Sequence, residues 1–444
     1  MKIKHIALKR LLKPFSLFLI TFIITPAAQS LAEWSVLTYI QADNSLADFA
    51  DYNITSMENG MQSTNNINML VQWDQPQNNK TWRYKIVPGN RIEDGSLSSE
   101  MGTYPATELV TAMQWVKTKY PAKKYALILW NHGSGIEDLR SKLTSKIYSK
   151  SMVRSWIEVP GASSNKARGI LYDDSQGTCL TNPALLSALQ QIKQNLGQNL
   201  ELLGMDACLM AMLEVAYQVK DNVNYFVGSQ QTEPGYGWNY QGFVSPLTSN
   251  PSMNGLTLAQ SIVAAYNSYY QSSNDAQDYT LSAYNLSKIN ALKLNIDQLV
   301  ASLANCKNKN AVTTLNMIKK SRNASTEMYM SEYIDLYSFY AALLKQMPKK
   351  EPKSSKILNK INKKNKKILS KEYQKSLSAL TQVLVSGMQK INDAVCANEA
   401  GPQLANVKGI SIYYPKQGAL HSSYANTLFA QQNSWVQFLQ TMRS

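Results

Sequence analysis

Short apolar runs alternate with amphipathic segments along the first half of the chain. The runs are rich in β-branched and aromatic residues and end in polar residues, glycine or proline, which is the pattern of buried strands. They read "WSVLTYIQAD" from Trp34, "INMLVQWD" from Ile67, "WRYKIVPG" from Trp82 and "KYALILWNHG" from Lys124. Between the last two runs, Leu109, Met113 and Val116 recur at helical spacing, so this segment is predicted to be a helix.

The same alternation continues between residues 182 and 231. Asn182 and Pro183 suit the N-cap and first turn of a helix that Gly197 ends. The strand "LELLGM" follows, then a segment that is apolar nearly all round and predicts a buried helix beginning at Cys208, then the strand "NYFVGSQQ". Strands that alternate with helices predict an α/β fold with a largely parallel sheet covered on both faces.

Two regions depart from this rhythm. Residues 136–169 hold seven lysines and arginines without a clean period and are predicted to form a long exposed loop. Beyond about residue 245 the pattern is mainly helical, with strand candidates at "DYTLSAY" and "KGISIYYP". We therefore divide the chain into a core, 33–245, and a C-terminal part, 246–444, which is either a smaller domain or a set of further layers on the same sheet.

Residues 1–32 have the pattern of a signal peptide. A basic start is followed by the apolar run Phe15 to Ile24 and by small residues suited to cleavage after Ala32, or nearby after Ala28 or Ser30. The apolar run is about half of the roughly 20 residues needed to span a bilayer, which disfavours a permanent anchor. The sequence thus predicts an exported protein, secreted or periplasmic.

Positive charge is concentrated in one segment. Removing residues 1–32 takes away five basic residues and lowers the formal charge from +15 to +10, and residues 348–371 hold ten lysines against one acid. Such a run is typical of a solvated insertion or exposed helix, with contact to an anionic envelope surface as the second interpretation. Because the run contains no aromatic residue for base stacking, no nucleic-acid partner is expected.

Cysteine and histidine are scarce. The four cysteines form no CxxC pair and are too scattered for a disulfide scaffold; export leaves room for one disulfide, with Cys306 and Cys396 as the most suitable pair. With three histidines in the whole chain, we expect no metal site and no cofactor, although a calcium requirement stays open. "YDDSQ", with Asp173 and Asp174, is interpreted as a polar turn.

His132 and Cys208 each directly follow an apolar strand. Functional groups of a parallel sheet gather at the carboxyl ends of its strands, so these two side chains are expected to meet. The imidazole can take the thiol proton and return it to a leaving amine, while the N-terminal dipole of the helix expected at Cys208 favours a thiolate. The N–H groups of Gly133 and Cys208 are the expected oxyanion donors, and acyl transfer is the indicated chemistry.

Several segments resemble one family of enzymes. "ILWNHGSG" and "GMDACLMAMLEVAYQV" resemble the two active-site motifs of the clostripain family of cysteine peptidases, which are relatives of caspases, gingipains and legumain. The resemblance extends to "VGSQQTEPGYGWNY", "YTLSAYNLSKI", "YIDLYSF" and "GISIYYP" in the family's order. It covers most of the chain after the signal segment.

The resemblance implies a caspase-like αβα sandwich with a mostly parallel central sheet and a mainly helical C-terminal region. It implies that His132 is the general base and acid, that Cys208 is the nucleophile, and that Asp206 is the carboxylate that selects Arg or Lys before the scissile bond. A buried carboxylate pairs well with a guanidinium or ammonium group. Asp206 is alternatively an N-cap for the expected helix. Gln230 and Gln231 stand where the family often has acids, which leaves Glu233 as the nearest carboxylate.

Members of the family are often activated by a cut between the histidine and the cysteine. Here that interval holds the basic loop, so self-cleavage is expected within it, and the lysine-rich segment 348–371 is a second expected cut site. The candidate residues in the loop are Arg140, Lys142, Lys146, Lys150, Arg154, Lys166 and Arg168.

Two other functions remain open at this stage. One is a catalytically silent caspase-like module that binds the envelope through its lysine-rich segment. The other is an Asn- or Asp-specific peptidase, although Asp206 would repel an acidic side chain in a desolvated pocket. We expect a monomer that acts on protein or peptide substrates; the natural substrate and the preference between Arg and Lys stay undetermined.

Overall fold

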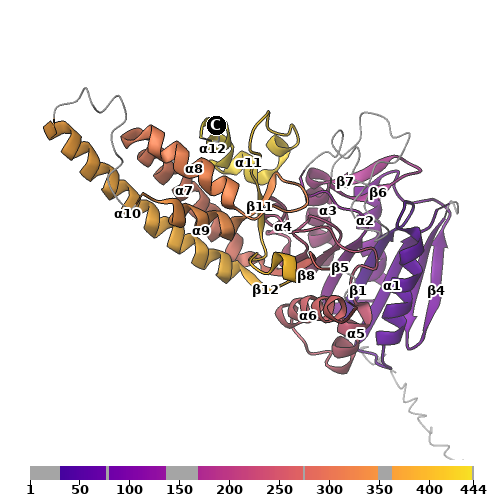
Figure 1. Ribbon diagram of the computed structural model, residues 1–444. Coiled ribbons are helices and arrows are strands. Elements are labelled where there is room, and N and C mark those ends of the chain that lie inside the picture. Colours follow the sequence, from indigo (N-terminus) through magenta and orange to yellow (C-terminus); the bar gives the residue numbers. More distant parts are fainter. Residues whose placement is uncertain (1–30, 77–79, 137–168, 274–275, 349–362, 443–444) are drawn as a thin grey trace, which may run out of the picture. The chain divides into compact units, whose positions relative to one another are not determined.

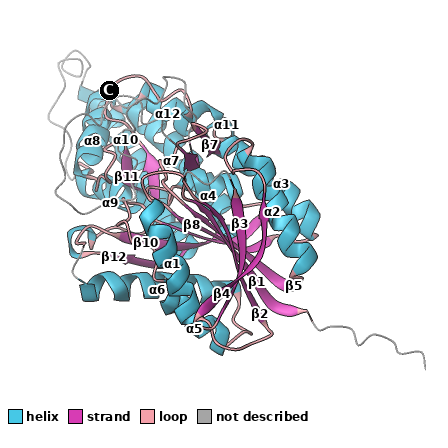
Figure 2. Cartoon of the chain, turned by 90° about the vertical axis from the view of Figure 1, so that its right-hand side faces the viewer, coloured by secondary structure: helices cyan, strands magenta, loops and turns pink. Residues whose placement is uncertain are grey.

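A mixed β-sheet runs through the protein. A computed structural model describes residues 31–76, 80–136, 169–273, 276–348 and 363–442, and the described residues from Ala32 onward belong to one compact unit. The described part contains a nine-stranded sheet in the order β12-β10-β9-β8-β5-β1-β2-β3-β4 (Figure 2). Its strands are β1 (Ala32–Gln41), β2 (Ile67–Asp74), β3 (Thr81–Val87), β4 (Asn90–Leu97), β5 (Ala122–Trp130), β8 (Leu200–Asp206), β9 (Val223–Gly228), β10 (Thr280–Asn285) and β12 (Val395–Ala400).

The centre of this sheet is parallel, as the sequence predicted. Strands β2, β1, β5, β8 and β9 are parallel neighbours, and β3, β4, β10 and β12 extend the two edges in antiparallel pairs. Most of the apolar runs became parallel strands because both faces of these strands are buried. The run from Trp82 became β3, which is antiparallel and only partly buried. Sequence analysis missed β4, which lies at the edge of the sheet and has no buried residue, so it carries no apolar signal.

Helices cover both faces of the sheet (Figures 1 and 2). Side chains of α1 (Ala47–Gly60), α5 (Tyr240–Ser249) and α6 (Gly255–Ser273) form one core with one face of the parallel strands. Side chains of α2 (Pro105–Lys119), α3 (Asn182–Leu196), α4 (Leu213–Val219) and α7 (Ile289–Lys309) form the core on the other face. Alternate residues of each strand therefore enter different cores, which makes the register of the sheet specific.

The C-terminal part shares the central sheet. It supplies β10 and β12 and a separate antiparallel pair, β11 (Tyr333–Asp335) with β13 (Ser411–Tyr413). Its remaining helices are α8 (Ala311–Ala324), α9 (Leu336–Gln346), α10 (Lys363–Ala394), α11 (Leu428–Gln432) and α12 (Trp435–Thr441). Most of the lysine-rich segment lies outside the described residues, and no helix in the described part is long and apolar enough to cross a membrane.

One local prediction is wrong. Thr181, and not Asn182, is the N-cap of α3, because the Thr181 hydroxyl accepts the N–H of Ala184 at 3.3 Å. Cys306 and Cys396, between which the sequence left a disulfide open, are both free thiols. The Cys306 thiol is hydrogen-bonded with Ser376, whereas Cys396 follows the end of α10, about 27 Å further along that helix at about 1.5 Å per residue.

A group of buried carboxyls lies at the ends of β1, β2 and β6 (Gly169–Asp173). Burial, reinforced by neighbouring carboxyls, raises the pKa of Asp74 to about 8. Burial likewise raises the pKa of Asp173 to about 7, and Asp43 adds to the shift. No three His, Cys, Asp or Glu side chains in the described part are arranged to hold a metal ion. With its pKa raised to about 8, Asp74 is mainly protonated at neutral pH.

A carboxyl group whose pKa is raised in the folded state contributes to the stability of that state only while it is protonated. The contribution of Asp74 is therefore complete below its unfolded pKa and is lost as the pH rises through about 8. In a Cys208→Ala background, we expect the free energy of unfolding to fall on the order of 4 kcal/mol between pH 5 and pH 9, and Asp74→Asn to flatten this slope. Urea unfolding across that pH range measures the slope in the Cys208→Ala protein and in its Asp74→Asn variant, and Asp48→Asn, at an exposed position, is the control. Equal slopes in these three proteins would contradict the raised pKa of Asp74.

Candidate active site

Strand pairing brings the two predicted catalytic residues to adjacent strand ends. Trp130 of β5 is paired with Asp206 of β8, and the N–H of Asn131 donates to the Asp206 carbonyl at 3.3 Å. His132 and Cys208 each lie two residues beyond this pair. Both are buried, with 1% and 0% of their surfaces exposed.

Cys208 lies in a turn and does not begin a helix. Leu209 adopts a left-handed φ of 65°, and α4 starts only at Leu213, so the predicted helix dipole at the thiol and the predicted N-cap role of Asp206 are both wrong. No helix can begin at Cys208, because the left-handed backbone of Leu209 cannot continue a right-handed helix. In place of the dipole, the N–H of Glu233 donates to the Cys208 sulfur at 3.1 Å, a hydrogen bond that favours a thiolate.

The turn that carries Cys208 is held from two sides. On one side, the N–H of Leu209 donates to Gln231 O at 3.1 Å and that of Ala211 donates to Ser229 O at 2.8 Å. On the other side, the N–H of Ser411 donates to Ala211 O at 3.0 Å. Residues 207–211, which we call the nucleophile turn after the predicted role of Cys208, are thus fixed between the segment after β9 and a strand of the C-terminal part.

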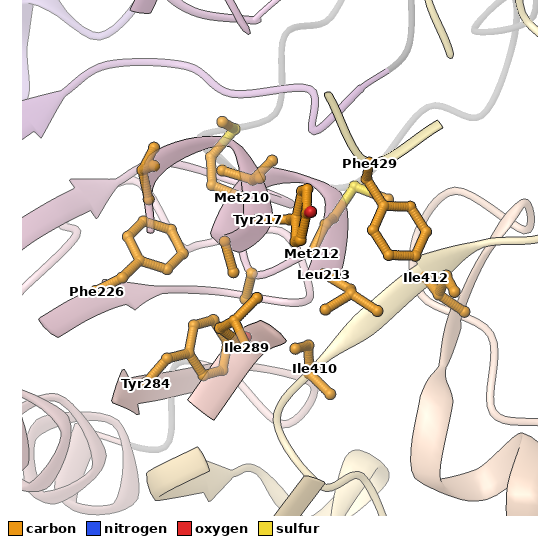
Figure 3. Close-up of a cluster of buried hydrophobic side chains, with 14 of the residues drawn as sticks. Met210, Met212, Leu213, Tyr217, Phe226, Tyr284, Ile289, Ile410, Ile412 and Phe429 are labelled. Atoms are coloured by element: carbon orange, nitrogen blue, oxygen red, sulfur yellow. The ribbon is translucent and has the colours of Figure 1, made fainter. Parts of the chain in front are cut away.

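Apolar packing anchors the same turn. Figure 3 shows Met210, Met212 and Leu213 within a cluster of side chains contributed by the sheet and by the C-terminal part. Phe226 comes from β9 and Ile412 from β13. Since methionine side chains adapt to irregular space, they let a tight turn fill this core without a helix.

Gly133 lies directly against the nucleophile turn. A β-carbon at this position would be 2.5 Å from the Cys208 carbonyl oxygen and 3.0 Å from the Met210 side chain, so only glycine fits. Gly133 also forms a bridge with Ile170 of β6. Beside it, the N–H of the next residue, Ser134, donates to Gly169 O at 3.2 Å.

Asn131 fixes the backbone at His132. Its side-chain oxygen accepts the N–H of His132 at 2.5 Å and that of Tyr172 at 2.8 Å. Its amide donates to the carbonyl oxygens of Gln41 and Tyr172. The hydroxyl of Ser45 lies 3.0 Å from Nε2 of His132. Sequence analysis missed Asn131 and Ser45; their only signal was their position directly after predicted strands.

Asp206 and Glu233 approach the same tryptophan. Asp206 Oδ2 accepts the hydroxyl of Tyr240 at 2.9 Å and the backbone N–H of Trp238 at 3.5 Å, while Glu233 Oε1 accepts the indole N–H of Trp238 at 3.5 Å. Both acids are fully buried. Burial, and after it the charge of Glu233, raises the pKa of Tyr266. The arrangement brings two buried acidic side chains to one tryptophan, and the backbone of one of these acids, Glu233, contacts the Cys208 sulfur.

The two glutamines of the same stretch have structural contacts. Gln230 donates to Asp335 Oδ2 at 3.2 Å and to the Ser411 hydroxyl at 3.0 Å. The Gln231 side chain accepts the N–H of Tyr329 at 2.7 Å. These neutral side chains connect the segment after β9 to the C-terminal part.

The loop after His132 differs in part from the prediction. Ser134 and Ile136 are buried, and the Tyr333 hydroxyl donates to Ser134 O at 2.8 Å, so the exposed loop does not begin at residue 136 as expected. Residues 137–168 lie outside the described residues. That range contains all of the candidate cleavage residues: Arg140, Lys142, Lys146, Lys150, Arg154, Lys166 and Arg168.

Comparison with known proteins places the chain in a family. The family model of the clostripain family, Peptidase_C11, matches residues 38–151 and 155–441. The chain is 25% identical over 356 residues to clostripain of Hathewaya histolytica, an alignment that covers 68% of this chain and 61% of that protein. The chain thus spans less than two thirds of that relative.

Solved structures share the fold. A secreted C11 cysteine protease from Bacteroides thetaiotaomicron, in complex with an irreversible peptide inhibitor, has a TM-score of 0.61 at 18% identity and covers 91% of this chain and 100% of its own. An inactive zymogen C11 protease from Parabacteroides distasonis has a TM-score of 0.57 at 18% identity and covers 91% of this chain and 99% of its own. The active-site motifs, the sheet that aligns them and the family match lead to one conclusion: the chain belongs to the clostripain family and has the fold of the C11 cysteine proteases.

Proposed function

We propose that the protein is a cysteine endopeptidase in which Cys208 is the nucleophile and His132 the general base and acid. The register of β5 with β8 carries this proposal, because it brings the imidazole and the thiol to neighbouring strand ends. Family membership supports it. A catalytically silent binding module is disfavoured, since both reacting groups are retained together with the glycine beside them.

The proposed reaction is acyl transfer in two steps. His132 takes the thiol proton, the sulfur attacks the peptide carbonyl, and the N–H groups of Gly133 and Cys208 stabilise the oxyanion. The C–N bond breaks as His132 protonates the leaving amine. Water then hydrolyses the thioester with His132 as base, which restores the thiol. Both reacting groups are side chains, so the reaction as proposed uses no cofactor.

Specificity for Arg or Lys before the scissile bond is the second part of the proposal. Two buried acids contact the same Trp238: Asp206, two residues before Cys208, and Glu233, whose N–H donates to the Cys208 sulfur. A guanidinium or ammonium group would pair with them in a desolvated site. An Asn- or Asp-specific peptidase is the weaker alternative, because a substrate carboxylate would meet like charge there.

Self-processing and export complete the proposal. In the intact chain Cys208 has no exposed surface, so a rearrangement is needed before a peptide reaches the sulfur. We propose that a cut within residues 140–168 allows it, that residues 1–32 direct export to the periplasm or beyond, and that the mature protein is monomeric. The lysine-rich segment 348–371 is proposed as a second cut site and as a contact for an anionic envelope surface.

Fluorogenic peptides ending in Arg, Lys, Asn or Asp test the activity. We expect processed wild type to cleave the Arg and Lys peptides only. Cys208→Ala and His132→Ala should each lower kcat by about 10⁴-fold or more, because the two residues act as one unit. Absence of turnover of every basic peptide by reduced, processed wild type would refute the proposed function.

The pocket is tested separately by Asp206→Asn, which removes the charge and keeps an oxygen for Tyr240. Loss of a buried charge partner should lower kcat/KM for the Arg peptide by about 100-fold. Alkylation of Cys208 by iodoacetamide serves as the control for an intact nucleophile and should change little. If the variant retains the wild-type preference for Arg, then Asp206 is not the specificity carboxylate; Glu233→Gln, measured in parallel, would show whether the other acid has that role.

Self-processing is tested by incubating purified chains and following them by mass spectrometry. Wild type should convert into a fragment that contains His132 and a fragment that contains Cys208, while Cys208→Ala stays intact. Adding active wild type to Cys208→Ala shows whether the cut also occurs between molecules. A wild-type chain that becomes fully active while it remains uncut would contradict the proposed activation.

A further inference from the structure

The hydroxyl of Ser45 contacts the imidazole of His132. Ser45 lies in the turn between β1 and α1, and its hydroxyl oxygen is 3.0 Å from Nε2 of His132. Ser45 is exposed while His132 is buried. A surface serine is thus within hydrogen-bond distance of a buried ring.

The backbone at Ser45 and the backbone at His132 are fixed by hydrogen bonds to the same two carbonyl oxygens, an arrangement that we call the shared frame. Each is directly preceded by an asparagine, Asn44 or Asn131, whose amide donates to the same two carbonyl oxygens. Asn44 Nδ2 is 3.1 Å from Gln41 O and 2.9 Å from Tyr172 O; Asn131 Nδ2 is 2.5 Å and 2.9 Å from them. Because two neighbouring residues share a single pair of acceptors, the turn after β1 and the end of β5 are fixed relative to each other.

The oxygen of each asparagine side chain tightens this frame. The oxygen of Asn44 accepts the N–H of Leu46 at 2.9 Å, and that of Asn131 accepts the N–H of His132 at 2.5 Å. Local side-chain bonds of this kind fix turns. The hydroxyl and the imidazole are thus placed by backbone that has little freedom to move, which is the arrangement expected of a preorganised site.

We propose that Ser45 is a positioning residue whose hydroxyl accepts the Nε2–H of His132, so that Nδ1 is the nitrogen that exchanges a proton with Cys208. The inference rests on the proposed His132–Cys208 dyad. In the resting pair the ring carries its proton on Nε2; Nδ1 then takes the thiol proton and later returns it to the leaving amine. No proton passes to Ser45, which only accepts a hydrogen bond throughout.

The direction of this hydrogen bond has a chemical consequence. If the hydroxyl instead donated to Nε2, the ring proton would sit on Nδ1, and Nδ1 could not deprotonate the thiol. An acceptor at Nε2 also binds the imidazolium more strongly than the neutral ring, because hydrogen bonds to charged groups are stronger. Ser45 therefore favours the thiolate–imidazolium pair over the neutral pair.

Ser45→Ala and Ser45→Thr test the proposal in the full, processed chain. We expect Ser45→Ala to lower kcat about 10-fold with KM nearly unchanged, and Ser45→Thr, which keeps the hydroxyl, to retain most of the rate. The control, Ser252→Ala, replaces an exposed serine whose hydroxyl donates to Asn250 Oδ1, and it should behave as wild type.

The pH dependence of Cys208 alkylation by iodoacetamide separates this inference from the proposed function, because it requires no peptide cleavage. Ser45→Ala should slow alkylation at neutral pH and move the profile to higher pH, as fewer thiolates form. A wild-type kcat and profile in Ser45→Ala, or a Ser45→Thr as slow as Ser45→Ala, would overturn the inference alone. If His132→Ala leaves the pH profile of Cys208 alkylation unchanged, then His132 does not act on the thiol, and both the proposed dyad and this inference are wrong.

Discussion

The parallel pairing of β5 with β8 is the constraint on which the rest of the site depends. With Trp130 opposite Asp206, the chain leaves both strands at the same level, and the next residues carry the imidazole and the thiol. Alternate residues of each strand enter different cores, so a shift by one residue would turn every side chain to the wrong face. Hydrophobic burial thus fixes the register, and the register fixes how far apart the proposed base and the proposed nucleophile lie.

The nucleophile turn depends on parts of the chain that are distant in sequence. Its backbone is bonded to the segment after β9 and to β13, and Gln230 ties that segment to Asp335 in the C-terminal part. A left-handed residue such as Leu209 costs about 1–2 kcal/mol in isolation, and these contacts together with the methionine packing in Figure 3 offset that cost. The C-terminal part is therefore a structural component of the site.

The histidine is supported in a different way. Its position comes from polar side chains at the strand ends, where Asn131 links β1, β5 and β6 through backbone carbonyls and N–H groups. Such bonds are directional, so they fix orientation as well as distance. Hydrogen bonds thus orient the proposed base, whereas packing and a backbone turn orient the proposed nucleophile.

By itself the sequence determined the parallel core, most of its strands, and the two residues that carry the proposed chemistry. These features are local: an apolar run predicts a buried strand, and a polar residue just after the run predicts a functional strand end. The glycine beside His132 was also visible, although the close approach to Cys208 O that requires it was not.

Only the tertiary structure decided the conformation of the nucleophile segment and the contacts of the histidine. The residues after Cys208 are apolar enough to predict a helix, but long-range hydrogen bonds to Gln231, Ser229 and Ser411 hold them in a turn. Likewise, nothing local to Ser45 indicates that it meets His132, which is 87 residues away in the chain. Their roles come from strand order and register, which depend on burial across the whole sheet rather than on any one segment.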